Sequence, residues 1–282
     1  MESPTLIQIE SSTACDAKCI FCPRSKLKRS PGSMSDVLFE KILVQAKEIQ
    51  VGEILLFLNG EPLIFPRLFD WLQALREYGF KTTLFTNANS LTEAKALMLI
   101  SYSDIIQTIV FSLGGFDKDT YNEIMGLDYD RVRQNVERFL QMNQNKIKTI
   151  AHIPHFSKSA PFAGSWHNVW DMIETKAYTA MFNFAGLVHD DLELKEDDRH
   201  NRSFCERLNH LTILWDGRVC LCCMDAEGQV ILGDAKTHPL IEIYNGNIVR
   251  YYRRLHQEER FLSLLLCKDC NMNITGRWRR QR

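Results

Sequence analysis

The sequence predicts an α/β fold built from six βα units, which could form an open parallel sheet or a partial barrel. Two observations predict it. Short apolar segments alternate with longer segments of helical periodicity from residue 5 to about residue 185. The chain of 282 residues is long enough for one large domain or for one domain plus a small appendage, and its composition, 45% hydrophobic and 24% charged, is ordinary for a globular protein.

The six predicted strands are rich in Ile, Val, Phe and Thr and have the length of ordinary strands. Because crossovers between parallel strands are right-handed, ligands are expected at the carboxyl ends of these strands. The predicted strands are Leu6–Glu10, Glu53–Leu58, Lys81–Phe85, Ile105–Ser112, Ile147–Ile153 and Tyr178–Phe184.

Helical patterns lie between these strands. Ser35 precedes an apolar helical face that runs from Val37 to Ile49. The run Ser90-Leu91-Thr92-Glu93 has the form of a capping box that starts a further helix. Two more apolar stripes predict helices around residues 69–75 and over Arg131–Met142.

A polar, charged stretch from Asp190 to Asn201 predicts a linker, so we expect domains at 1–189 and 204–282 joined by residues 190–203. In the second domain, Leu211–Asp216 and Arg218–Leu221 around Gly217 predict a hairpin. Ile241–Glu259 predicts one helix.

Charge and composition narrow the function. A net charge of −1 gives no general attraction to nucleic acid, and no run approaches the roughly 18 apolar residues of a membrane span. The N-terminus lacks the pattern of a signal peptide. Nine cysteines in two separate groups suit metal ligation in a reducing cytoplasm better than a disulfide framework.

The first cysteine group directly follows the first predicted strand. Cys15, Cys19 and Cys22 have the spacing C-x3-C-x2-C, and three thiolates this close can hold three corners of an iron–sulfur cube. The fourth iron is then open to a small molecule. A structural zinc site is the alternative, although zinc usually needs a fourth ligand nearby.

This spacing, with Phe21 before the last cysteine, resembles the signature of the radical S-adenosylmethionine (radical SAM) superfamily. Further motifs follow in the family's order after the second, third and fourth strands. They are Asn59-Gly60-Glu61-Pro62, Thr86-Asn87 and Ser112, which the resemblance assigns to SAM binding. Two positions depart from the family: its Asp after the serine is Gly114 here, and its Arg before the helix glycine is Met125 before Gly126.

The resemblance implies a partial (β/α)6 TIM-like barrel with a [4Fe–4S] cluster on Cys15, Cys19 and Cys22. SAM would bind the open iron and, after one-electron reduction by a flavodoxin- or ferredoxin-type donor, yield a 5′-deoxyadenosyl radical. That radical removes a hydrogen atom from the substrate.

The second group has the order C-x11-G-x4-C, a long gap, then C-x2-C, and resembles the SPASM/twitch extension of radical SAM enzymes. Because no cysteine follows Cys270, it resembles the shorter twitch form with one auxiliary [4Fe–4S] cluster. The implied ligands are Cys205, Cys222, Cys267 and Cys270. A four-cysteine zinc knuckle is the alternative.

Four further residues and one charged run are candidates for other roles. Cys220 and Cys223 are either small apolar fillers or donors of a hydrogen atom to a substrate radical. His152 and His155 flank Pro154 at the end of the fifth strand, where a barrel enzyme contacts its substrate. The run Arg24, Lys26, Lys28 and Arg29 predicts a solvated basic surface.

The resemblance favours oxidation of a small polar, sugar- or cyclitol-like substrate, with the auxiliary cluster accepting the second electron. It is similar in size and cluster count to the twitch aminocyclitol dehydrogenases. One alternative is a radical SAM enzyme that epimerises or crosslinks a ribosomal peptide. Another, from a different class, is a non-catalytic zinc-binding protein.

Overall fold

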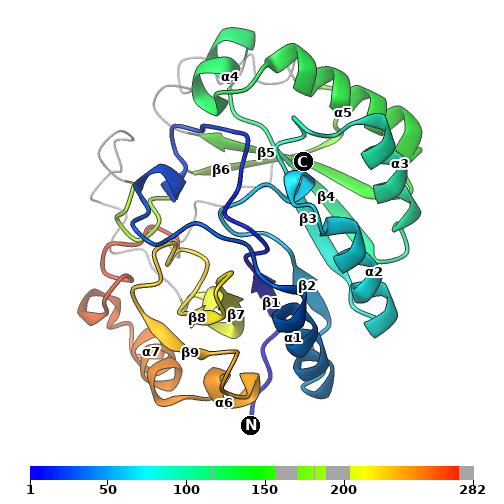
Figure 1. Ribbon diagram of the computed structural model, residues 1–282. Helices are drawn as coiled ribbons and strands as arrows, with labels where there is room; N and C mark the ends of the chain where they lie inside the picture. Colours follow the sequence, from blue (N-terminus) through cyan, green and yellow to red (C-terminus); the bar gives the residue numbers. More distant parts are fainter. Residues whose placement is uncertain (116, 156–169, 181, 189–203, 273–282) are drawn as a thin grey trace. The chain divides into compact units, whose positions relative to one another are not determined.

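The computed structural model describes residues 1–115, 117–155, 170–180, 182–188 and 204–272 (Figure 1). The chain forms two compact units whose segments interleave along the sequence. Of the described residues, the first unit contains 1–14, 23–60, 182–188 and 204–272, and the second contains 15–22, 61–115, 117–155 and 170–180. The predicted linker lies outside the described residues, and the predicted domain boundaries stay predictions.

The second unit is built on a four-stranded, fully parallel sheet in the order β3-β4-β5-β6 (Figure 1). Helices α3 and α5 pack against each other along it, and Phe111 of β4 meets Phe139 of α5 edge-on at 5.8 Å. The elements are η2 (Pro62–Ile64), α2 (Leu68–Tyr78), β3 (Thr82–Thr86), α3 (Glu93–Ser101), β4 (Ile106–Ser112), α4 (Lys118–Met125), α5 (Tyr129–Asn143), β5 (Lys148–His155) and β6 (Thr175–Ala180).

The first unit is built on a mixed sheet in the order β2-β1-β7-β8-β9. Strand β1 pairs in parallel with both β2 and β7, whereas β7, β8 and β9 pair antiparallel. The elements are β1 (Leu6–Ile9), η1 (Pro23–Lys26), α1 (Asp36–Glu48), β2 (Glu53–Leu55), η5 (Glu206–Asn209), β7 (His210–Ile213), β8 (Arg218–Cys220), β9 (Ile231–Asp234), α6 (Leu240–Tyr244), α7 (Asn247–Gln257) and η6 (Phe261–Ser263).

The predicted α/β class and the parallel strands are confirmed, and so is the hairpin, whose turn glycine Gly217 has a φ of +93°. The parallel pairing of β7 with β1 was not predicted, because the hairpin was assigned to a separate domain. Strand β9 was also not predicted. The N-terminal strand therefore shares one sheet with the cysteine-rich C-terminal segment.

Two strand boundaries were wrong. β2 ends at Leu55 because the next carbonyls accept from side chains instead of a neighbouring strand: Ser11 Oγ donates to Leu56 O at 3.1 Å, and Gln8 Nε2 donates to Phe57 O at 2.9 Å. β6 runs from Thr175 to Ala180, earlier than predicted, because Phe184 and the next two residues have positive φ and leave extended geometry.

Two helix predictions were also wrong in detail. The helix predicted over 241–259 is two helices, because Gly246 adopts an extended conformation (φ −68°, ψ 164°) between α6 and α7. Helix α3 begins at Thr92, whose side chain accepts from Lys95 N, and not at Ser90. The Ser90 hydroxyl is used elsewhere, as described below. Among the described residues, no helix has the length and apolar character needed to cross a bilayer.

Candidate functional site

The first cysteine motif forms a loop that lies against the end of helix α4. Lys18 N donates to Met125 O at 3.1 Å and Ile20 N donates to Ile124 O at 3.0 Å. Gly126 ends the helix with φ +62°, and a Cβ there would come within 2.9 Å of Lys18 Cβ. The close approach of the loop to α4 therefore depends on glycine at this position.

The two departures from the family pattern lie against each other in this region. A Cβ on Gly114 would come within 2.8 Å of Met125 Sδ and 2.7 Å of Ile124 Cγ2. Met125 is itself almost fully buried. The apolar side chain of Met125 therefore occupies the space beside position 114, where the family has an Asp.

Asp16, between the first two cysteines, fastens the motif to the residues that follow β3. Its carboxylate accepts three hydrogen bonds of 2.8 Å, from Asn87 Nδ2, Asn89 Nδ2 and Ser90 Oγ. Burial would raise the pKa of Asp16, but these hydrogen bonds outweigh it and lower the pKa. The same Asn87 amide lies 3.8 Å from Cys15 Sγ.

Glu61 joins its own loop to the end of β3. Its carboxylate accepts from Leu63 N at 3.0 Å, Thr86 Oγ1 at 2.6 Å and Asn87 N at 2.8 Å. Burial raises the pKa of Glu61 to about 7, against these hydrogen bonds, and the charge of Asp16 raises it slightly further. Thr86, Asn87 and Glu61, three residues assigned to SAM binding, therefore form one connected group.

The other predicted SAM-binding residues are distributed differently. Gly60 has no room for a side chain, because a Cβ would come within 2.0 Å of Ser12 O. Asn59 Nδ2 donates to Glu10, Pro62 is buried at the start of η2, and Ser112 ends β4. Phe21 is half-buried in the cysteine loop.

Burial lowers the pKa of His152 to about 4, so its imidazole is neutral near pH 7. His152 lies on β5 beside Ser112 of β4 in the strand register. His155 is the last residue of β5, and its side chain lies outside the described structure.

An orphaned buried donor also belongs to the first site. Tyr121 is 0% exposed, and its hydroxyl has no hydrogen-bond partner among the described residues. The negative groups of Cys19, Asp16 and Glu61 act on this hydroxyl, after burial itself, to raise its pKa. An unsatisfied donor beside a cysteine loop fits a site that binds a polar ligand.

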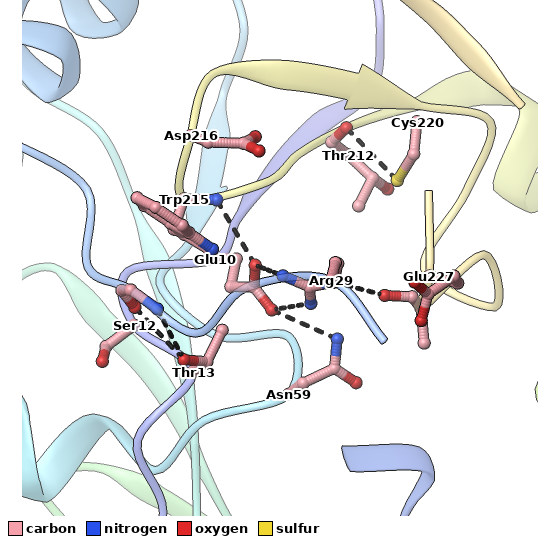
Figure 2. A network of polar contacts seen from close by, with 12 residues as sticks. Glu10, Ser12, Thr13, Arg29, Asn59, Thr212, Trp215, Asp216, Cys220 and Glu227 are labelled. Atoms are coloured by element: carbon pink, nitrogen blue, oxygen red, sulfur yellow. Dashed lines mark hydrogen bonds and ion pairs between the residues drawn. The ribbon is translucent and has the colours of Figure 1, made fainter. Parts of the chain in front are cut away.

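A buried ion pair holds the segment that follows the first motif (Figure 2). Arg29 binds both carboxylate oxygens of Glu10, at 2.8 and 2.5 Å, and Glu10 also accepts from Asn59 and from Trp215 N. The two charged side chains are 4% and 0% exposed. Arg29 was predicted to lie on a solvated basic surface, and that was wrong because Glu10 neutralises it inside the unit.

The same arginine reaches the loop after Cys222 and Cys223. Arg29 Nε donates to Ala226 O at 2.7 Å, and Lys28 N donates to Glu227 Oε2 at 2.9 Å. The segment leaving the first cysteine motif is thus hydrogen-bonded to the loop that carries part of the second.

The second cysteine group lines one pocket in the first unit. Cys205, Cys222, Cys267 and Cys270 all contribute to it, and most of the other lining is apolar, including Leu208, Leu221, Leu266 and Met272. His256 and Arg207 are its basic lining residues. Burial raises the pKa of Cys205 to about 12 and that of Cys222 well above its usual value, so bound metal would have to stabilise both thiolates.

Cys220 and Cys223 have different surroundings. Cys220 is fully buried in β8, and its thiol donates to Thr212 O at 3.7 Å (Figure 2). Cys223 packs with Met224 and Met272 beside Cys222 and Cys270. Burial raises the pKa of both thiols, so they stay protonated.

Across the part of the chain that the structure describes, no three Cys, His, Asp or Glu side chains are already arranged as a metal-binding group. The ligand assignments therefore depend on spacing, on the shared loop of the first group and on the shared cavity of the second. Four thiols on one mainly apolar cavity suit a buried iron–sulfur cluster.

Sequence reasoning missed Asp16, the Glu10–Arg29 pair and His256. Asp16 had one available signal: an acidic residue inside the motif, with a run of Asn and Ser donors after the third strand. The other contacts join residues far apart in the sequence, and no local pattern marks them.

Comparison with known proteins finds one family model over each cysteine group. Residues 9–159 match the family model described as the radical SAM superfamily, and residues 205–271 match SPASM, an iron–sulfur cluster-binding domain. The S-adenosyl-L-methionine-dependent 2-deoxy-scyllo-inosamine dehydrogenase of Niallia circulans is 22% identical over 274 residues, which cover 95% of this chain and 92% of that protein. The probable GTP 3′,8-cyclase of Methanothermobacter thermautotrophicus is 25% identical, over 60% of this chain and 52% of its own length.

Solved structures share the fold. BtrN in complex with AdoMet and 2-DOIA has a TM-score of 0.69 at 18% identity, covering 96% of this chain and 94% of BtrN. Streptococcus suis SuiB bound to precursor peptide SuiA has a TM-score of 0.71 at 18% identity, covering 96% of this chain and 70% of SuiB.

Proposed function

Because this chain belongs to the radical SAM superfamily, we propose that it is an oxidoreductase that dehydrogenates a small polar, sugar- or cyclitol-like substrate. The observation that carries the proposal is the cavity shared by Cys205, Cys222, Cys267 and Cys270. One four-cysteine cavity fits a single auxiliary [4Fe–4S] cluster, which can accept the electron that a substrate radical must lose. The end-to-end match to a dehydrogenase supports the same reaction class.

Cys15, Cys19 and Cys22 are the proposed ligands of the first [4Fe–4S] cluster. When bound, that cluster and SAM supply the 5′-deoxyadenosyl radical that removes a substrate hydrogen atom. The chain's own contribution is to hold the loop, and Asp16 does so through three side-chain hydrogen bonds. A cysteine loop that is held by hydrogen bonds from neighbouring residues keeps its geometry when the molecule bound beside it changes.

We assign the methionine end of SAM to Glu61 and its neighbours. An ionised carboxylate has about four acceptor sites, and three donors of the chain occupy three of them. A carboxyl group whose pKa burial raises to about 7 gains most from a cation placed beside it, such as an ammonium group. The Tyr121 hydroxyl is the proposed second polar contact.

We place the substrate near Ser112 and His152, at the carboxyl ends of β4 and β5. Because burial keeps His152 neutral, it would orient a hydroxyl group by hydrogen bonding and would not bind an anion. His155 is assigned to the same place by its position on β5. This arrangement favours a polyhydroxylated molecule over an acidic one.

A second candidate is epimerisation or another modification of a peptide, with Cys223 as hydrogen-atom donor. The observation that favours it is a thiol packed beside Cys222 and Cys270 that burial keeps protonated. Cys220 is a weaker donor candidate because its thiol is bonded within the sheet, to Thr212 O. A peptide that gains one deuterium per residue in deuterated water would favour this function over dehydrogenation.

The test is anaerobic reconstitution with iron, sulfide, SAM and a reductant, assayed for 5′-deoxyadenosine and for a ketone or aldehyde. We expect about eight irons per chain for two [4Fe–4S] clusters. The Cys15/Cys19/Cys22 triple alanine variant should form no 5′-deoxyadenosine. About two zinc ions per chain without iron would contradict the enzyme function altogether.

The electron donor and the compartment belong to the proposal as well. We infer a flavodoxin- or ferredoxin-type reductant, because the first cluster needs one electron per cleavage. None of the nine cysteines forms a disulfide, as expected of a protein in a reducing, cytoplasmic location.

A further inference from the structure

His256 lies against one of the cysteines that line the auxiliary cavity. Its Nε2 is 3.4 Å from Cys267 Sγ, and the residue is 2% exposed. Helix α7 ends at Gln257, so His256 is one residue from the helix end. The ring and the four cysteines line the same cavity.

The ring is held in place by aromatic neighbours. Phe261 meets it edge-on at 4.8 Å with an interplanar angle of 71°, and Phe204 meets it at 6.0 Å and 77°. The loop that carries Cys267 is fixed as well: Leu266 has a left-handed φ of +70°, and Cys267 N donates to Leu265 O at 2.9 Å. The approach of nitrogen to sulfur is therefore built into the packing of both partners.

We propose that His256 donates a hydrogen bond from Nε2–H to the Cys267 sulfur and so raises the reduction potential of the auxiliary cluster. The inference rests on the proposed function, which makes Cys267 a cluster ligand. His256 is a tuning and positioning residue, and it keeps its proton throughout. The substrate radical would be oxidised by one electron and the cluster reduced by one electron, and no bond is made or broken at the imidazole.

The direction of the effect follows from charge. A reduced cluster carries one more negative charge than an oxidised one, and a donor aimed at its sulfur stabilises the reduced form more. The mainly apolar lining of this cavity strengthens that interaction. A higher potential makes the auxiliary cluster a better acceptor of the substrate electron.

The experiment is redox potentiometry of the reconstituted enzyme, followed by the EPR signal of the auxiliary cluster. We compare His256→Leu, which removes the donor, with His256→Gln, which retains an N–H near the Nε2 position. We expect His256→Leu to shift the midpoint to a more negative potential. The reduced-to-oxidised ratio at a fixed solution potential should fall about tenfold, which corresponds to about 59 mV for a one-electron couple. His256→Gln should recover most of the shift.

Val249→Ala is the matched control, because Val249 is buried on the same helix, seven residues from His256. It weakens the packing of α7 without removing a donor, so its midpoint should equal that of the unchanged protein. A midpoint in Val249→Ala that moves as far as in His256→Leu would overturn the assignment.

Pulsed EPR gives a second measurement. Met272 N donates to Cys270 Sγ at 3.4 Å and contributes one exchangeable proton near the cluster. The unchanged protein should show a further exchangeable proton, coupled to the reduced auxiliary cluster, that disappears in deuterated water and is missing in His256→Leu. The inference is overturned if that proton is absent, if the midpoint is the same in His256→Leu, or if that variant loses the cluster iron. Failure of the proposed function looks different, because the unchanged protein would then assemble no second cluster.

Discussion

The two cysteine groups, which we propose as cluster sites, place their thiols in opposite surroundings. The first loop is fixed by polar groups: Asp16 accepts three side-chain hydrogen bonds, and an amide of Asn87 approaches Cys15 Sγ. The second group lines a mainly apolar cavity, where one imidazole approaches Cys267 Sγ. A site that must bind and release a polar cosubstrate benefits from surrounding polar groups, whereas an electron-transfer site benefits from their exclusion.

The difference extends to how each loop is supported. Charges that shape the second site lie beside it: Asp225, 1% exposed, accepts from Gln229 N at 2.8 Å and Val230 N at 2.9 Å, and Arg29 binds Ala226 O. In the first site the supporting carboxylate lies within the cysteine loop. Removing Arg29 should therefore affect mainly the folding of the first unit. Removing Asp16 should affect mainly the chemistry at the first cysteine group.

The largest effect is expected from the buried ion pair of the first unit. Arg29→Met leaves the Glu10 carboxylate buried without its cation and should lower the free energy of unfolding by about 3–5 kcal/mol. Denaturant unfolding measures this value. Lys28→Met is the control, because at position 28 the described hydrogen bond is made by the backbone.

The double variant Glu10→Leu/Arg29→Met sharpens the test. An apolar pair of similar volume should recover much of the lost stability, because the cost comes from the unpaired charge. An Arg29→Met protein as stable as Lys28→Met would show that the pair contributes nothing to this loop.

Much of the fold could be predicted because the parallel strands are local apolar runs of Ile, Val, Phe and Thr. Errors arose where a side chain replaced a backbone partner. Ser11 and Gln8 end β2 by donating to its continuation, and Ser90 serves Asp16 in place of capping α3. Such choices depend on residues distant in sequence, which a local pattern cannot show.

The candidate site, like the fold, could be predicted from the sequence only in part. The chemistry could be predicted because the cysteine spacings, with the motifs after the second, third and fourth strands, resemble those of the radical SAM superfamily; from spacing alone, zinc remained an alternative. The supports could not be predicted, because Arg29 looks like one member of an exposed basic run until Glu10 is placed beside it. Asp16 could have been found by asking which acceptor the Asn and Ser residues after β3 would serve.

An intermediate effect is expected from the support inside the first loop. Asp16→Ala removes three hydrogen bonds from the cysteine loop and should slow 5′-deoxyadenosine formation by about 10- to 100-fold. The initial rate under anaerobic conditions measures this, with iron content determined on the same sample. Asn89→Ala removes one of the three bonds and should lose less activity. Equal rates for Asp16→Ala and the unchanged protein would show that the first cysteine loop does not depend on this polar support.

A pH dependence of stability is expected at Glu61. Burial raises its pKa to about 7, above the ordinary value of 4.5, so the fold favours the protonated form. The stability that Glu61 contributes is complete below pH 4.5 and is lost as the pH rises through 7, on the order of 2–4 kcal/mol.

The unfolding temperature should therefore fall between pH 5 and 8 more steeply in the unchanged protein than in Glu61→Gln, which cannot ionise. Asp16→Asn should move the decline to lower pH, because the negative charge of Asp16 raises the pKa of Glu61 and this variant removes it. Asn89→Ala, which removes one hydrogen bond of Asp16 but keeps its charge, is the control. Parallel pH profiles for Glu61→Gln and the unchanged protein would show that this carboxyl group is not the polar, ionisable centre that sets the first site apart from the second.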